Sequence, residues 1–366
     1  MRLAFTDEQE ELRTSVRRLL AEHWSPEKRR AALDSAEPYD ARLWKTMAEG
    51  LGLHGMAIPE EYGGAGYGFV EQSVVLEEIG RALLRAPYLS TVTVAATALQ
   101  AGQDEALRAD WLPRIAAGQA VAALAHDERR GARPAAAVRD GAGWRVSGTK
   151  AYVVDGAQAD LFVVTATGDD GPVLLAVEGS ADGVATLEHP TLDLTRRLAT
   201  VTFTEAQGRA IAVGDQARDV LDRTLDVAAV ALACEQVGGA AAALEMTVEY
   251  AKIREQFGAP IGSFQAIKFK CADMLLDLEA ARSAAYYAAA SVNDNAADLP
   301  IAASVAKAVC SDAYTAITAE MIQIHGGIGY TWEHDAHLYF KRAKAAQHLF
   351  GDADRHRARL ADLVGI

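Results

Sequence analysis

The sequence predicts an α+β protein of three domains: an N-terminal all-α domain, a middle β-barrel or sandwich domain and a C-terminal four-helix bundle. The spacing of hydrophobic residues predicts this order, and the length and composition predict the number of domains. Hydrophobic residues follow helical spacing to about residue 118, form short β-type runs from about 120 to 210, and return to helical spacing from about 215. The 366 residues are 50% hydrophobic, enough to build two or three domains of ordinary size. We place the domains at 1–118, 119–212 and 213–366.

The N-terminal zone begins with a helix-capping pattern. Thr6 and Gln9 have the spacing of a capping box, and apolar residues then recur at helical spacing. Ser25 followed by Pro26 predicts a second helix, because proline suits the first helical turn. Further helices are expected near 41–49, 69–84, 87–100 and 104–117. The loop 59–68 is rich in glycine but follows no strand, so we interpret it as a plain turn rather than a dinucleotide fingerprint.

The middle zone consists of short runs of β-branched and aromatic residues bounded by Gly and Asp, which is typical of strands. We expect strands at 143–148, 151–154, 161–165, 173–177 and 199–203.

The last zone predicts long helices near 216–256, 264–292, 300–325 and 334–349. Short turns containing Gly, Pro or Asn separate them, which favours an antiparallel four-helix bundle. Two apolar stripes fit helical spacing: Ile267, Cys271, Met274, Leu275 and Leu278, and then Ile317, Met321 and Ile324.

Composition argues against several classes of protein. A net charge of −14 and a pI near 5.1 disfavour a general nucleic-acid binder, which needs a basic surface for phosphates. The N-terminus lacks the apolar segment of a signal peptide, and no uninterrupted apolar run of about 18 residues predicts a membrane span. We therefore expect a cytoplasmic protein with no membrane partner.

Cysteine and histidine spacing predicts no metal site. Cys234, Cys271 and Cys310 lie in apolar helical patterns without CxxC spacing, which indicates buried free thiols. His334 and His337 are three residues apart, but no pattern supplies a third ligand.

Two phrases in the last third of the chain carry a family resemblance. Arg254-Glu255-Gln256-Phe257-Gly258 and Gln323-Ile324-His325-Gly326-Gly327-Ile328-Gly329 resemble the segments with which acyl-CoA dehydrogenases hold the pyrophosphate and adenine end of FAD. The order of helices, β segment and bundle is also that of this family, along essentially the whole chain. The resemblance therefore implies the acyl-CoA dehydrogenase fold and FAD as cofactor.

The resemblance also implies roles for individual residues. Arg254 and Phe257 match residues that reach a neighbouring subunit's FAD, and Gln265 matches a further contact. Arginine can bind a phosphate with two hydrogen bonds, and glycine lets a backbone approach a ligand closely. The cofactor-binding candidates are Arg254, Phe257, Gln265, Gln323, Ile324, His325, Gly326 and Gly327. The alternative interpretation is a solvated Arg254, a core Phe257 and a helix C-cap at Gly326-Gly327.

At the flavin end the chain departs from the family pattern. Relatives that hold the flavin ring use Thr-Glu-Pro, Gly-Ser-Asp and Lys-x-Trp-Ile-Thr stretches, whereas this chain has Ala125-His126-Asp127, Arg130-Gly131-Ala132 and Lys150-Ala151-Tyr152-Val153-Val154. Lys150 is kept, but each hydroxyl that would bond the flavin is gone. A lost hydroxyl donor leaves a buried polar group of the ring unpaired, at about 1–3 kcal/mol each.

The family's catalytic base is also missing. Its glutamate removes the substrate α-proton, nine residues after an arginine or, in a second lineage, 22 residues before a tyrosine. Counting from Arg342 and Tyr250 leads to Gly351 and Ala228, so no catalytic residue is assigned. Asp352 and Asp226 are near these positions but are offset and have a shorter side chain.

The stretch from Trp332 to Ala343 resembles a segment of actinobacterial acyl-CoA dehydrogenases of steroid side-chain degradation, in which two different subunits form an α2β2 heterotetramer. The resemblance implies a homologous partner subunit that supplies the glutamate, an acyl-CoA substrate (a steroid side-chain CoA or a simpler fatty acyl-CoA), and an electron-transfer flavoprotein as acceptor. Two alternatives stay open: a self-sufficient flavoenzyme of this fold with a relocated base, and a non-catalytic acyl-CoA-binding or structural paralogue.

Overall fold

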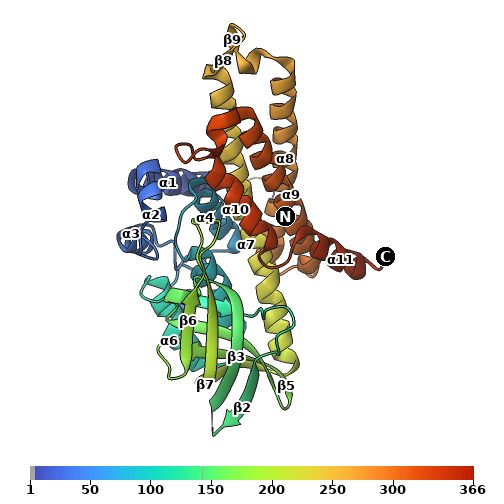
Figure 1. Cartoon of the computed structure of the whole chain (residues 1–366). Coiled ribbons are helices and arrows are strands. Elements are labelled where there is room, and N and C mark those ends of the chain that lie inside the picture. The colour runs from blue at the N-terminus through green and yellow to red at the C-terminus, as the bar shows by residue number, and fades with distance from the viewer. Residues whose placement is uncertain (1–4, 142) are drawn as a thin grey trace. The chain divides into compact units, whose positions relative to one another are not determined.

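The computed structural model describes residues 5–141 and 143–366 (Figure 1). The predicted fold class is confirmed: helices come first, a β domain follows, and long helices end the chain. By contacts the chain forms two compact units. One comprises the chain through Ala31 together with Phe69–Leu84 and Ala229–Ile366; the other comprises Ala32–Gly68 and Arg85–Ala228. The boundaries of the three predicted domains stay predictions.

The N-terminal helices match the expected positions closely. Thr6 Oγ1 accepts from the Gln9 amide over 3.3 Å and Gln9 Oε1 accepts from the Thr6 amide over 2.9 Å, so the capping box is confirmed. The segment expected as one helix near 87–100 is instead a buried π-helix, Tyr88–Ala95, that continues into α5. The α-helices of this zone are α1 (Asp7–His23), α2 (Pro26–Leu33), α3 (Ala41–Leu51), α4 (Phe69–Ala82), α5 (Ala96–Ala101) and α6 (Glu105–Ala116).

Seven strands form a sheet that closes on itself in the order β1-β4-β2-β3-β7-β5, because β4 also pairs with β5, while β6 pairs with β7. Phe162 and Phe203 meet edge to face in the apolar interior, with ring centroids 5.7 Å apart. Strands β1, β2 and β6 were not expected from the sequence. The strands are β1 (Ala122–Ala125), β2 (Ala136–Asp140), β3 (Gly143–Val154), β4 (Leu161–Gly168), β5 (Gly171–Glu178), β6 (Val184–Glu188) and β7 (Leu198–Val213).

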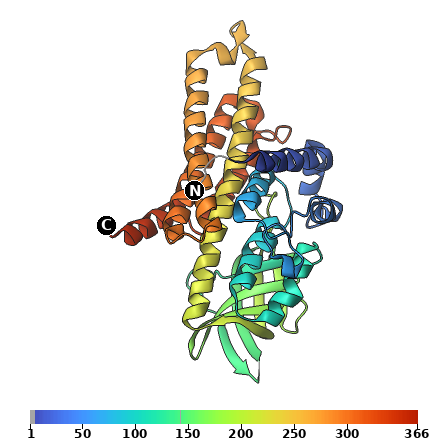
Figure 2. The same ribbon diagram turned by 180° about the vertical axis from the view of Figure 1, so that it is seen from behind.

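The C-terminal zone contains the four expected helices and one more, α11. Figures 1 and 2 show α7 and α8 running side by side and joined at one end by a small hairpin, β8 (Glu255–Gln256) and β9 (Ala259–Pro260). The helices are α7 (Asp215–Ile253), α8 (Gln265–Asn293), α9 (Leu299–His325), α10 (Ala336–His348) and α11 (Ala353–Val364).

Helix α7 is long and apolar enough to cross a membrane, which differs from the expectation that no segment is. The most apolar part of this helix is wholly buried inside the protein.

Two glycines let α4 and α7 cross backbone to backbone. A Cβ on Gly80 would lie 1.9 Å from the Glu235 carbonyl oxygen, and one on Gly238 would lie 1.8 Å from the Glu77 carbonyl oxygen. Any larger residue would force the helices apart.

The apolar pattern of α8 is only partly buried. Met274 and Leu278 are buried as predicted, but Leu275 is exposed and Ile267 is half-buried. The three cysteines are free, as expected; Cys271, however, is half-buried rather than buried. Helical spacing identifies an apolar face but not what covers it, and 49% of the surface of Leu275 stays exposed.

Candidate functional site

The first predicted phrase forms the hairpin that joins α7 to α8. Glu255 pairs with Pro260 and Gln256 with Ala259, so Phe257 and Gly258 form the two-residue turn. Both have positive φ, 53° and 78°. Such turns favour Asn-Gly, because a side chain with a bulky ring is strained at positive φ.

Phe257 extends into solvent with 95% of its surface exposed, which excludes the interpretation of this residue as core. Its ring meets that of Phe264 edge to face, with centroids 6.2 Å apart. Gln265, also exposed, is the first residue of α8. Arg254 is exposed as well, and no carboxylate among the described residues pairs with its guanidinium. The structure therefore brings Arg254, Phe257 and Gln265 together around one exposed turn.

The second predicted phrase lies at the end of α9. Gln323 is exposed, whereas Ile324 and His325 are buried. Gly326 caps the helix with φ 62°, so the C-cap interpretation is correct for this residue. Gly327 is different: its φ is not positive and a Cβ would meet nothing within 4 Å. Nothing within the described chain requires glycine at 327.

Tyr250, which sequence reasoning did not assign to the site, connects the two phrases. It lies in the last turn of α7, four residues before Arg254, and its ring stacks on His325 with centroids 4.3 Å apart and planes at 21°. His325 Nδ1 lies 2.7 Å from the Met321 carbonyl oxygen, and burial lowers the pKa of His325. The position of an aromatic residue one helical turn before Arg254 could have identified Tyr250 from the sequence.

Neither expected base position carries an acid. Gly351 lies in the turn between α10 and α11 with φ 98°, and Ala228 is buried in α7. Asp352, one of the alternative bases, has a structural role: its carboxylate accepts from the Arg355 amide over 2.9 Å and caps α11. Asp226, the other, is buried.

One buried carboxylate near the helix centre escaped sequence reasoning. Glu235 of α7 forms a buried ion pair with Arg342 of α10, the arginine from which the base position was counted. Because the guanidinium occupies it, this carboxylate is not a free base. A single acidic residue within a long apolar stretch of helix could have identified Glu235 from the sequence.

In the β domain, Lys150 forms hydrogen bonds with other residues of the same chain. It is buried, and its Nζ donates to Thr165 Oγ1 over 2.7 Å, to the His126 carbonyl oxygen over 3.2 Å and to Glu128. Burial lowers its pKa. Tyr152, at the position where relatives have tryptophan, is exposed with φ 56°.

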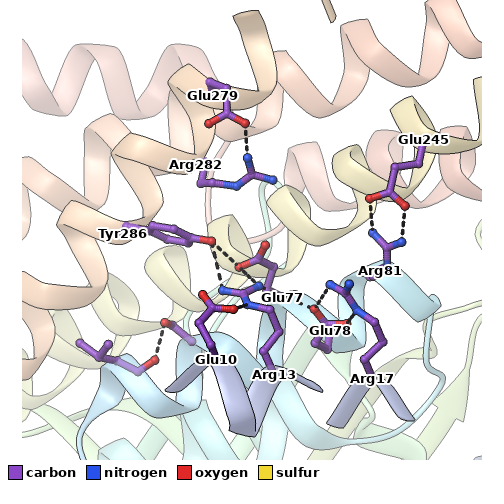
Figure 3. Close-up of polar contacts among 12 residues, drawn as sticks. Glu10, Arg13, Arg17, Glu77, Glu78, Arg81, Glu245, Glu279, Arg282 and Tyr286 are labelled. Atoms are coloured by element: carbon purple, nitrogen blue, oxygen red, sulfur yellow. Dashed lines mark hydrogen bonds and ion pairs between the residues drawn. The ribbon is translucent and has the colours of Figure 1, made fainter. Parts of the chain in front are cut away.

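A cluster of ion pairs joins α1, α4, α7 and α8, and the sequence did not predict it (Figure 3). Glu77 accepts from Arg13 over 2.9 Å and from the Tyr286 hydroxyl over 2.8 Å. Glu78 binds the guanidinium of Arg17 with two hydrogen bonds of 2.9 and 2.7 Å. Burial acts to lower the pKa of Arg13, but Glu77 and Tyr286 outweigh it and raise the pKa above its ordinary value.

This cluster surrounds a cavity of about 350 Å³. Four arginines and four glutamates balance each other there, so the cavity suits neither an apolar chain nor an ion of one sign. Its charged lining comprises Glu10, Arg13, Arg17, Glu77, Glu78, Arg81, Glu245 and Arg282. No group of three or more His, Cys, Asp or Glu in the described part of the chain is arranged to hold a metal ion.

Comparison with known proteins decides the family. Residues 6–119 match the acyl-CoA dehydrogenase N-terminal domain and residues 218–364 match the C-terminal domain. Acyl-CoA dehydrogenase IpdE2 of Mycolicibacterium smegmatis is 35% identical over 356 residues, covering 97% of this chain and 98% of the relative. The chain belongs to the acyl-CoA dehydrogenase family. IpdE2 of Mycobacterium tuberculosis is 39% identical, covering 94% of this chain and 93% of the relative.

Solved acyl-CoA dehydrogenases have the same fold. A variant of the steroid acyl-CoA dehydrogenase Tcur3481-Tcur3483 is similar with a TM-score of 0.91 and 36% identity, covering 98% of each chain. The ChsE4-ChsE5 complex of M. tuberculosis gives a TM-score of 0.93 and 29% identity, covering 100% of this chain and 99% of the other. The acyl-CoA dehydrogenase described here is thus an FAD-dependent oxidoreductase acting on CH–CH bonds.

Proposed function

We propose that this acyl-CoA dehydrogenase is the subunit without the base in a heteromeric enzyme that desaturates an acyl-CoA. It supplies the adenine and pyrophosphate side of a shared FAD site, and a homologous subunit supplies the flavin pocket, the catalytic glutamate and the acyl-CoA cleft. The observation that carries the proposal is Phe257, an aromatic residue that is both strained and almost fully exposed.

Strain and exposure at Phe257 both cost free energy in a single chain. A non-glycine residue at positive φ costs about 1–2 kcal/mol, and an exposed ring gains nothing from burial. The unpaired guanidinium of Arg254 and the open space at Gly327 likewise serve no contact among the described residues. A ligand that carries both anionic groups and an aromatic ring would contact the Phe257 ring, the Arg254 guanidinium and the open space at Gly327. We assign Arg254 to the pyrophosphate, and Phe257, Gln265 and Gln323–Gly327 to the adenine side.

The chemistry of desaturation divides between two chains in this proposal. FAD, when bound, accepts the hydride that leaves the substrate β-carbon. Removal of the α-proton needs a carboxylate, and the two positions where the family places one are Gly351 and Ala228 here. The Asp352 carboxylate caps α11, and the Glu235 carboxylate pairs with Arg342. Neither carboxylate therefore supports the alternative of a self-sufficient flavoenzyme with a relocated base.

A homologous subunit fits the exposed apolar end of the bundle. Phe257, Tyr330 and Trp332 are exposed there, and aromatic residues are enriched at protein interfaces. Two similar solved structures are named as pairs of different subunits, Tcur3481-Tcur3483 and ChsE4-ChsE5. We propose an α2β2 assembly, and a steroid side-chain CoA as substrate because the first pair is described as a steroid enzyme.

An electron-transfer flavoprotein is the proposed acceptor. One similar solved structure is described as an electron transferring flavoprotein of Acidaminococcus fermentans. Its TM-score is 0.93 and its identity 27%, covering 100% of this chain and 99% of the other.

The test is the FAD content of the assembly. The chain is purified alone and after co-expression with a homologous subunit encoded nearby, and FAD per chain and acyl-CoA oxidation are measured. We expect a colourless, inactive isolated chain, and an active complex with about one FAD per two chains. Arg254→Gln should lower FAD content, whereas Arg18→Gln, which removes an exposed arginine of α1, should not.

A yellow isolated chain with one FAD per chain that oxidises acyl-CoA would overturn the proposal. Asp352→Asn then distinguishes a relocated base, since it would abolish that activity, whereas we expect it only to weaken the cap of α11.

A further inference from the structure

Three rings are stacked where α9 ends. His325 lies between Tyr250, with ring centroids 4.3 Å apart and planes at 21°, and His334, with centroids 4.5 Å apart. Because a carbonyl oxygen can only accept, His325 Nδ1 donates to the Met321 carbonyl oxygen over 2.7 Å, which fixes the orientation of the ring. The Ala336 amide donates to His334 Nδ1 over 3.1 Å and fixes the second histidine in the same way. The backbone therefore holds both histidine rings of the stack.

Tyr250 restrains His325 at a second point, its carbonyl group. The Tyr250 hydroxyl donates to the His325 carbonyl oxygen over 3.4 Å. The next residue, Gly326, then changes the direction of the chain, with φ 62° and ψ −139°, a conformation that residues with a side chain rarely adopt. The ring stack and the hydroxyl thus restrain the peptide group at which the segment Gly326-Gly327 begins.

Tyr250 is equally close to the first phrase. The Arg254 amide donates to the Tyr250 carbonyl oxygen over 2.9 Å, a helical hydrogen bond at the end of α7. The Ile261 amide donates to the Arg254 carbonyl oxygen over 2.7 Å and closes the hairpin of β8 and β9. A continuous series of contacts therefore leads from Arg254 through Tyr250 to Gly326.

We propose that Tyr250 is a positioning residue that acts through His325 and holds the two phrases in one arrangement for FAD. The inference rests on the proposed function and deepens it, because it assigns a role to a residue outside both phrases. A segment that must be ordered at the moment of binding lowers affinity, since its lost conformational entropy opposes association. With the stack in place, the segment Gly326-Gly327 is ordered before FAD binds.

The experiment measures the affinity of the complex with the homologous subunit for FAD. The FAD-free complex is titrated with FAD, with the unchanged chain and with its variants. Tyr250→Leu removes the stack and should weaken FAD binding about tenfold, the size expected when one or two groups are no longer ordered in advance. Tyr250→Phe keeps the stacked ring and should weaken binding less than about threefold, because a hydrogen bond of 3.4 Å is weak.

A double variant tests whether Tyr250 acts through His325. His325→Leu should weaken FAD binding as Tyr250→Leu does, and Tyr250→Leu/His325→Leu should be no weaker than either single variant, since all three lack the same stack. If Tyr250→Leu does not fold, His325→Leu removes the stack from the other side and has to give the same loss. Effects that multiply in the double variant would overturn the inference.

Hydrogen exchange of the isolated chain tests the positioning without the cofactor. The amides of Gly326–Tyr330 should exchange faster in Tyr250→Leu than in the unchanged protein, whereas Tyr250→Phe should leave them slow and exchange in α4 should not change. Tyr287→Leu, which removes a partly exposed tyrosine of α8, is the matched control. It should change neither this exchange nor FAD affinity.

Arg254→Gln separates failure of this inference from failure of the proposed function. If Arg254→Gln lowers FAD affinity while Tyr250→Leu changes neither FAD affinity nor exchange, the inference alone is wrong and the stack only packs the helices together. If Arg254→Gln leaves FAD affinity unchanged, the proposed function is overturned, and the inference with it.

Discussion

Lys307 holds the backbone at Gly351: its buried Nζ donates a hydrogen bond to the Gly351 carbonyl oxygen over 2.9 Å. The same amine donates to the Gln347 carbonyl oxygen over 3.1 Å and to Ser311 over 2.9 Å. Burial lowers the pKa of Lys307 to about 8. The position at which the sequence analysis expected the family's base is therefore a turn fixed from inside the bundle.

Gly351→Glu, which returns a glutamate to that position, should not restore a self-sufficient enzyme. Gly351 has φ 98°, and a Cβ there would lie 3.1 Å from His356 Nε2. We expect a loss of about 1–3 kcal/mol in the free energy of unfolding and no acyl-CoA oxidation by the isolated chain. Denaturation in urea and dye reduction by acyl-CoA measure the two effects.

Gly365→Glu is the matched control for Gly351→Glu. Gly365 also has positive φ, 78°, but a Cβ there would meet nothing within 4 Å. Gly365→Glu should lower the free energy of unfolding less than Gly351→Glu, because it adds backbone strain but no steric contact. A stable Gly351→Glu chain that oxidises acyl-CoA alone would show that the turn accommodates a base after all.

Phe257→Asn should stabilise the isolated chain and weaken the complex. Asparagine tolerates positive φ better than phenylalanine, so we expect the free energy of unfolding to rise by about 0.5–1 kcal/mol. FAD content of the co-expressed complex should fall. Tyr67→Asn, at an exposed aromatic residue whose φ is not positive, should give neither effect. Unchanged FAD content would remove Phe257 from the proposed site.

The parts of this protein that the sequence predicted well are those governed by local rules. Thr6 and Gln9 form their capping box because three-residue spacing alone determines it. Strand β1, of the sequence Ala-Ala-Leu-Ala, was missed because alanine has little β preference and the strand exists only through its pairing with β4. The predicted hairpin residues meet for the same local reason: Arg254, Phe257 and Gln265 are close in sequence.

Long-range polar contacts were not predictable from the sequence. Glu77 and Glu78 lie in an apolar helix, and only the fold reveals that Arg13 and Arg17 of α1 reach them. Leu275 was expected on a buried apolar stripe, but 49% of its surface is exposed. The partial exposure of this apolar stripe is consistent with the proposed partner subunit.

Arg13→Met should destabilise the unit built from α1, α4, α7 and α8. Glu77 is buried, so loss of Arg13 leaves a buried carboxylate short of its counter-ion, at a cost of roughly 3 kcal/mol. Arg13→Met/Glu77→Met should recover much of that loss. Chemical denaturation of the two single variants and the double variant gives the coupling energy.

The exposed pair Arg218–Asp215 is the comparison for Arg13. Arg218→Met should change the free energy of unfolding by less than about 0.5 kcal/mol, because exposed ion pairs contribute little. Similar effects of Arg13→Met and Arg218→Met would mean that water already solvates the cluster around the cavity.

His54 should make the protein acid-sensitive. It is fully buried against Trp44, with ring centroids 3.8 Å apart, and burial lowers its pKa from 6.5 to about 3. As pH falls below 6.5, His54 binds a proton in the unfolded chain but stays neutral in the folded protein. The stability that depends on neutral His54 is therefore complete above pH 6.5 and is lost progressively toward pH 3.

Between pH 6.5 and about pH 5 the loss attributable to His54 should reach about 2 kcal/mol. His54→Phe keeps a ring beside Trp44 and removes the titrating group, so its free energy of unfolding should fall less steeply over this range. His348→Gln, at an exposed histidine, serves as control and should keep the slope of the unchanged protein. Urea denaturation of all three proteins at several pH values measures the slopes. Parallel curves for the unchanged protein and His54→Phe would mean that His54 is protonated inside the fold, and that a neighbouring group or water accommodates its charge.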